Sequence, residues 1–268
     1  MPIAGVLTTE NDHSFCFHID TFTDELKGLI REHLSTICYG KNLVSRGLEA
    51  HSYQNTLASL KGRYEDKTPD IRKGMIGELL THVVICSNLE QYEIASPYFN
   101  MEEKSARKGF DLLLVADQGQ TLWVTEVKSG ELGATPGPDQ KTRNLLQQAK
   151  RDLNERLNQA EQSFWQNAIN TVLVAISDCT DYKDAVIEIL GDEQELAATG
   201  EANSQDNSVI LVSVLYHDPN NKFDPRTTEA AATSIADEDI FGEILTISIQ
   251  KEAYQQIADF LFEEELDA

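Results

Sequence analysis

Apolar and polar residues recur along the chain with two different periods, which together predict a mixed α/β protein. Apolar residues spaced three or four apart are typical of one helix face, and the first such pattern follows Thr23-Asp24-Glu25. A largely apolar stretch, RKGMIGELLTHVVICS, predicts a helix that is buried on most sides. The predicted helices cover residues 23–37, 51–64, 72–87, 139–164 and 252–262.

Short apolar runs bounded by turn residues predict the strands. The runs 110–116 and 121–128 are separated by Asp117-Gln118-Gly119-Gln120, so they predict an antiparallel hairpin. Residues 171–177 (TVLVAIS) are apolar throughout, which is typical of a strand at the centre of a sheet. The other predicted strands cover residues 14–19, 92–97, 208–216 and 244–249, and irregular polar segments are expected at 191–207 and 217–239.

This order of elements predicts an α/β fold in which helices flank both faces of a mixed central sheet. The 268 residues, 41% of them hydrophobic, suffice for one compact domain with a large core. We expect an N-terminal strand and helices (1–71) packed on a core (72–178), with an acidic C-terminal extension (179–268) completing the sheet.

The net charge of −23 is spread unevenly. Residues 1–177 hold 23 acidic and 18 basic residues, a balance of −5, whereas residues 178–268 hold 22 and 4, a balance of −18. Between Lys104 and Arg156 the nine basic residues outnumber the seven acidic ones. The C-terminal third would repel a phosphate backbone, and the middle of the chain would not.

The chain lacks the features of membrane and secreted proteins. No apolar run reaches the roughly 18 residues of a membrane-spanning helix, and the first residues, MPIAGVLTTENDHSFCF, do not resemble a signal peptide. The four cysteines are widely spaced without a CxxC pair, which favours reduced thiols over disulfides or zinc. A cytoplasmic protein with no membrane partner is expected.

The candidate chemistry lies on the predicted hairpin, in Asp111 and Glu126-Val127-Lys128. Side chains alternate along a strand, so Glu126 and Lys128 point to one side, and the hairpin brings Asp111 close to them. Burying these charges costs several kcal/mol unless they are paired or bind a metal. Two carboxylates and the carbonyl of Val127 are the oxygen ligands that Mg²⁺ or Mn²⁺ prefers.

With such a cation bound, Lys128 would orient the attacking hydroxide or stabilise negative charge on a phosphate. The alternative is a surface ion pair between Glu126 and Lys128, since ExK is common by chance.

Glu78 is a further candidate because a carboxylate in the apolar helix 72–87 is unusual. We expect it to point towards the same metal. The alternative is a helix-surface glutamate paired with Lys73. His82, one turn further on the same face, is predicted to be a core histidine with its polar atoms satisfied rather than a site residue.

Gly77-Glu78, Gly109-Phe110-Asp111 and Glu126-Val127-Lys128 together resemble the motifs of the PD-(D/E)XK nuclease superfamily. The resemblance covers about residues 72–178 and implies a restriction-endonuclease-like α-β-β-β-α-β core. It also implies that Asp111 and Glu126 are metal ligands, that Lys128 is the catalytic lysine and that Glu78 is the family's helical glutamate. Phe110 stands where the family name has proline.

A narrower resemblance rests on GFDLLLV (109–115), LWVTEVKSG (122–130) and the following helix rich in Gln and Leu. These segments resemble HamA, the effector family of bacterial Hachiman anti-phage defence. The resemblance implies a DNA-cleaving effector whose helicase partner, HamB, senses abnormal DNA and restrains or releases the nuclease.

The DNA contacts are inferred from charge. Lys104, Arg107 and Lys108 lead directly into the strand after Asp111 and are the preferred candidates for binding the DNA backbone, with a solvated loop as the alternative. Asp178 either faces the site or is a turn residue. The basic residues of the next helix, Lys141, Arg143, Lys150 and Arg151, form a second candidate group.

Three functional hypotheses follow. The first is a Mg²⁺- or Mn²⁺-dependent DNA endonuclease controlled by a partner protein. The second is a catalytically inactive interaction module or acidic nucleic-acid mimic. The third, a sequence-specific restriction enzyme, ranks last because residues 191–240 are too acidic to read bases and no separate recognition domain is evident.

Overall fold

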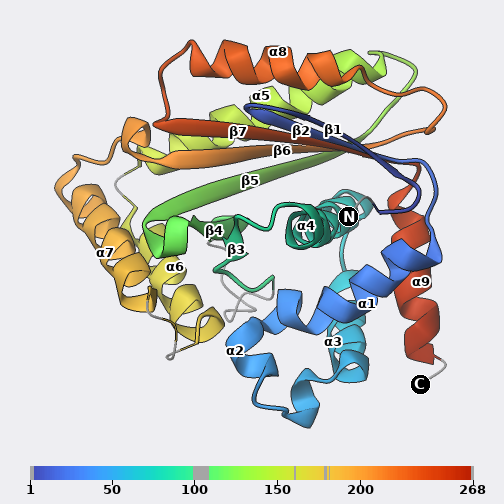
Figure 1. Ribbon diagram of the computed structural model, residues 1–268, viewed down its shortest axis with the longest axis horizontal. Helices are drawn as coiled ribbons and strands as arrows, with labels where there is room; N and C mark the ends of the chain where they lie inside the picture. The colour runs from blue at the N-terminus through green and yellow to red at the C-terminus, as the bar shows by residue number, and fades with distance from the viewer. Residues whose placement is uncertain (1–2, 99–108, 160, 178–179, 181, 267–268) are drawn as a thin grey trace.

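The computed structural model describes residues 3–98, 109–159, 161–177, 180 and 182–266. Within these residues, helices flank both faces of a seven-stranded mixed sheet, which confirms the predicted fold class (Figure 1). The order of the strands is β1-β2-β7-β6-β5-β4-β3. The strands are β1 (Val6–Asn11), β2 (Ser14–Ile19), β3 (Glu93–Ile94), β4 (Leu112–Ala116), β5 (Thr121–Glu131), β6 (Ser208–Tyr216) and β7 (Glu243–Lys251).

The middle of the sheet is parallel and its edges are antiparallel. Strand β6 pairs in parallel with β5 on one side and with β7 on the other, and β7 pairs in parallel with β2. Strands β1, β4 and β3 pair antiparallel with their neighbours. Residues 209–216 of β6 are all buried, as expected for a strand covered by helices on both faces.

Two groups of helices cover the two faces of the sheet (Figure 1). Each group buries its own apolar cluster against the sheet, and burial of apolar area is the main force that holds such layers together. None of the described helices is long and apolar enough to cross a membrane. One face is covered by α1 (Asp24–Tyr39), α3 (Tyr53–Glu65), α4 (Pro69–Asn88) and α9 (Tyr254–Leu266), with α2 (Lys41–Val44) beside α1. The other is covered by α5 (Pro138–Leu157) and α8 (Pro225–Ala236), and α6 (Gln162–Ala175) and α7 (Lys183–Thr199) join its apolar cluster near β4 (Figure 1).

The first helices begin where capping residues occur in the sequence. The hydroxyl of Thr23 accepts a hydrogen bond from the N–H of Leu26, and Thr68 accepts one from Ile71. These bonds satisfy N–H groups that have no partner inside a helix. The structure confirms the helices predicted at 23–37, 51–64 and 72–87, as α1, α3 and α4.

The strand predicted at 171–177 is wrong, because most of these residues form the end of α6, and the helix predicted to reach Phe164 ends at Leu157. Trp165, Ala168 and Val172 are buried at helical spacing. An apolar run of seven residues does not by itself distinguish a buried strand from a buried helix. The strand that pairs with β5 is instead β6.

The irregular segments predicted at 191–207 and 217–239 are also partly wrong, since α7 extends to Thr199 and α8 occupies much of the second segment. Asp224 caps α8 by accepting the N–H of Arg226 at 3.0 Å, and Pro225 fills the first turn. Asp-Pro is therefore a helix start here. Strand β1 was not predicted, and β3 is only two residues long.

The hairpin that carries the candidate residues is confirmed. Leu112 pairs with Thr125 and Ala116 with Thr121, so the next position, Asp111, falls beside Glu126. The turn between β4 and β5 places three consecutive residues at positive φ, and Gly119, at φ 87°, is the last of them. A Cβ at Gly119 would lie 2.3 Å from the Cβ of Tyr182, so glycine is required there on two counts.

Candidate active site

Glu126 and Lys128 lie on the face of β5 that is covered by α5. Lys128 Nζ is 2.6 Å from Glu126 Oε1, and the Glu126 side chain is only 1% exposed. The prediction that the two side chains share one side of the strand is confirmed. A surface ion pair, the alternative interpretation, is wrong because the carboxylate is buried in the protein.

Helix α5 contributes two further charges to this pair. Arg156 Nη1 is 2.6 Å from Glu126 Oε2, and its Nη2 is 3.4 Å from Oε1. Asp152 Oδ2 is 3.0 Å from Lys128 Nζ. The four residues form a chain of alternating charge, Asp152–Lys128–Glu126–Arg156, in which both oxygens of the buried carboxylate are engaged. Such charge-assisted bonds offset the cost of burying Glu126.

Asp152 and Arg156 were not predicted as site residues. A signal for them is present in the sequence, because the series Leu145, Ala149, Asp152, Arg156 continues the spacing of the apolar face of α5. Charged residues in the buried register of a helix require partners. The identity of those partners depends on which strand the helix covers.

Asp111 stands immediately before β4, is half-buried, and accepts the backbone N–H of Val127 at 2.8 Å through Oδ2. Burial and the negative charge of Glu126 raise the pKa of its carboxyl to about 7, against the opposing effects of the Val127 N–H, Lys128 and Arg156. The two carboxylates therefore interact unfavourably, and additional positive charge near Asp111 would relieve this repulsion.

The ammonium of Lys128 is held in its charged form. Burial lowers its pKa, but the charge of Glu126 and the hydrogen bonds to Glu126 and Asp152 outweigh burial and leave the pKa above its ordinary value. Lys128 is therefore a cationic hydrogen-bond donor at neutral pH. This favours a role in stabilising negative charge over a role as a base.

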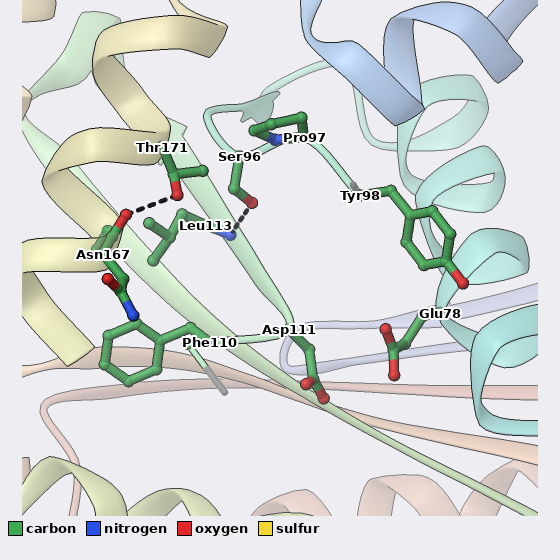
Figure 2. Close-up of a pocket in the computed structure, with 11 residues that line it drawn as sticks. Glu78, Ser96, Pro97, Tyr98, Phe110, Asp111, Leu113, Asn167 and Thr171 are labelled. Carbon is green, nitrogen blue, oxygen red and sulfur yellow. Dashed lines mark hydrogen bonds between the residues drawn. The ribbon is translucent and has the colours of Figure 1, made fainter. Parts of the chain in front are cut away.

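Glu78, on α4, lines the same pocket as Asp111 (Figure 2). The pocket has a volume of about 160 Å³, and the two carboxylates lie at one end of it, with the ring of Tyr98 above Glu78. Lys73, the alternative partner of Glu78, pairs with Asp70 at 3.2 Å and with Glu131 at 2.9 Å. The remaining lining residues are Ser96, Pro97, Gly109, Phe110, Leu113, Asn167, Ala168 and Thr171.

Gly77 sets how closely α4 approaches β5. A Cβ at this position would lie 1.9 Å from Ser129 Oγ and 3.0 Å from Ser129 Cβ. Only glycine allows the helix this contact without a shift of the serine. The close approach places the next residue, Glu78, beside the end of the hairpin.

His82 is a core residue, as predicted, but it is not satisfied. Its side chain is fully buried, and neither ring nitrogen has a hydrogen-bond partner in the part of the chain that the structure describes. The ring meets that of Tyr98 edge-on at 5.9 Å. Burial lowers the pKa of His82 to about 3, so the imidazole is neutral in the folded protein.

We predict that His82 makes the protein sensitive to acid. The unfolded chain takes up a proton below a pKa near 6.5 and the folded chain does not, so stability is lost as pH falls from about 6.5 towards 3. His82→Leu should reduce the difference in unfolding free energy between pH 7.5 and pH 5 by roughly 2 kcal/mol. Urea unfolding of both proteins at the two pH values measures this, and an unchanged difference would contradict it.

The donor set is compatible with one divalent cation. Among the described residues, no group of three or more His, Cys, Asp or Glu side chains is arranged to hold a metal. Mg²⁺, however, often binds through one or two carboxylates and keeps several waters and substrate oxygens as its other ligands. Asp111 and Glu126 supply two carboxylates, and a bound cation would offset the burial of Asp111 and its repulsion by Glu126, the two effects that raise its pKa.

The preferred DNA-binding candidates, Lys104, Arg107 and Lys108, lie outside the described residues, as does Asp178. On α5, Lys150 is paired with Glu238 at 2.8 Å, and Arg143 bonds to Gln140 at 3.1 Å. The pairing of Lys150 with an acidic side chain makes it less available to a phosphate.

Fold and site together define a mixed α/β protein in which the β4–β5 hairpin brings together a buried glutamate, a half-buried aspartate and a lysine. The model of the HamA family matches residues 5–264, nearly the whole chain, and the chain belongs to this family. HamA is a component of Hachiman anti-phage defence. A comparison with curated proteins gives no match.

Proposed function

We propose that this protein is a metal-dependent DNA endonuclease, the effector of a Hachiman system. The observation that carries the proposal is the cluster of Asp111, Glu126 and Lys128, which the β4–β5 hairpin places together beside a pocket. This arrangement resembles the PD-(D/E)XK nucleases, and membership of the HamA family supports a role in defence.

Asp111 and Glu126, with the carbonyl of Val127, would hold the Mg²⁺ or Mn²⁺. When bound, such a cation lowers the pKa of a water and screens the charge of a phosphodiester. Lys128, charged and fixed by Glu126 and Asp152, would donate a hydrogen bond to a phosphate oxygen as negative charge develops on it. Glu78, at the same end of the pocket, would position a water or the cation.

The charge of the chain supports control by a partner. Residues 178–268 carry a balance of −18, and a protein so acidic binds a phosphate backbone weakly by itself. This region is also part of the core, because β6 and β7 lie in the middle of the sheet. It is therefore poorly suited to be a separable acidic mimic. A HamB-type helicase would bring DNA to the site and release the nuclease.

The test is cleavage of supercoiled plasmid, linear DNA and RNA by the purified chain, with and without the helicase partner. We expect DNA cleavage that requires Mg²⁺ or Mn²⁺, stops with a chelator and is strongest with the partner. A folded protein that cuts no nucleic acid with any of these cations, alone or with its partner, would favour the non-enzymatic interaction module.

A further inference from the structure

Arg156 lies directly against the carboxylate of Glu126, the candidate metal ligand. It lies on α5 with a side chain only 16% exposed, and it donates to both oxygens of the carboxylate. The same guanidinium is 3.5 Å from the carbonyl oxygen of Gly109 and lies 5.8 Å from the centre of the Phe164 ring. Contacts on several sides fix it against the carboxylate.

The two candidate metal ligands differ in their hydrogen-bond partners. Glu126 receives bonds from two cations, Lys128 and Arg156, whereas the hydrogen bond found for Asp111 within the described residues comes from a backbone N–H. Lys128 is itself shared with Asp152. If Asp111 and Glu126 hold a divalent cation, an oxygen of Glu126 has to be taken from one of these partners.

Arg156 is the partner that would give way. Arg156 bonds to both oxygens of Glu126, so a cation that takes either oxygen displaces one of its bonds. Lys128 bonds to Oε1 alone and has Asp152 as a second acidic partner. The guanidinium would also lie close to the bound cation. Two positive charges a few ångströms apart repel each other strongly in a partly buried site. A guanidinium that leaves a carboxylate has a natural second partner in a phosphate, which matches its planar pair of donors.

We propose that Arg156 is a positioning residue that holds Glu126 in the metal-free protein and competes with the divalent cation for it. The proposal rests on the metal site of the proposed function. The cation binds weakly while Arg156 engages Glu126, and a phosphodiester at the site favours loading because it accepts the displaced guanidinium. Metal and DNA thus raise each other's affinity for the protein, and the metal site stays mostly empty until DNA binds.

The test is calorimetric titration of Mn²⁺ into the wild-type protein and into Arg156→Gln, without DNA. We expect Arg156→Gln to bind Mn²⁺ at least about tenfold more tightly, a typical size for such coupling. Arg143→Gln, on the exposed side of the same helix, is the matched control and should bind as the wild type does. Arg156→Lys, which keeps the charge but loses the paired geometry, should be intermediate, and it decides the matter if the glutamine variant does not fold.

A purely structural Arg156 would give the opposite result, because a disordered Glu126 would bind Mn²⁺ more weakly. Weaker or equal binding by the Arg156 variants, or no measurable binding by any of the proteins, overturns the proposal. DNA cleavage by the wild type is read separately. Cleavage with unchanged Mn²⁺ affinity in the variants refutes the competition alone, and tighter binding without any cleavage refutes the nuclease alone.

Discussion

Replacing Lys128 by methionine should lower the rate of Mn²⁺-dependent DNA cleavage by at least about 100-fold, the typical loss when one donor to transition-state charge is removed. Methionine has a similar length and no charge. Glu126 would keep its bonds to Arg156, so the fold should persist. The measurement is the initial rate of conversion of supercoiled plasmid to nicked and linear forms.

Lys222→Met is the control for this variant. Lys222, with a side chain 32% exposed, is likewise paired with a carboxylate, that of Asp20, at 2.6 Å. Its loss removes a similar ion pair outside the candidate site. Cleavage should be unchanged. Equal losses in the two variants, or full activity of Lys128→Met, would contradict the role given to Lys128.

Arg156→Ala should lower the free energy of unfolding of the metal-free protein by about 3 kcal/mol, the lower end of the range for breaking a buried ion pair. The carboxylate of Glu126, 1% exposed, would keep Lys128 as its cationic partner but would lose both bonds from the guanidinium. Urea unfolding followed by the fluorescence of the buried Trp123 and Trp165 measures the change.

Arg143→Ala gives the comparison, since Arg143 is exposed and the loss should stay within about 0.5 kcal/mol. Millimolar Mn²⁺ should restore part of the stability of Arg156→Ala, because a bound cation replaces the missing charge beside Glu126. If both alanine variants unfold alike, the Asp152–Lys128–Glu126–Arg156 chain does not stabilise the fold.

The part of the site that depends on local geometry could be predicted from the sequence. Alternation along a strand places Glu126 and Lys128 on one side, and a short turn fixes the register that brings Asp111 beside them. The apolar composition of residues 72–87 predicts the helix that carries Glu78. The position of Glu78 at the pocket further depends on Gly77, whose contact with Ser129 appears only in the structure.

The part that depends on long-range packing could not be predicted. Asp152 and Arg156 become site residues because α5 covers the face of β5 that carries Glu126, and no local pattern determines that choice. The same dependence on packing explains why the strand predicted at 171–177 is wrong. Its apolar run fits either a buried helix or a buried strand, and packing decided for the helix, with β6 taking the place beside β5.

The most direct test compares plasmid cleavage by the wild type and by Asp111→Asn, with Mn²⁺ at pH 7.5. The folded-state pKa of Asp111, about 7, lies above its ordinary value, so the ionised side chain destabilises the fold. Asparagine carries no charge, and the substitution should therefore not lower the free energy of unfolding. We predict cleavage by the wild type and at least about 100-fold slower cleavage by Asp111→Asn. Equal rates for the two folded proteins would contradict the assignment of this cluster as the centre of a metal-dependent nuclease.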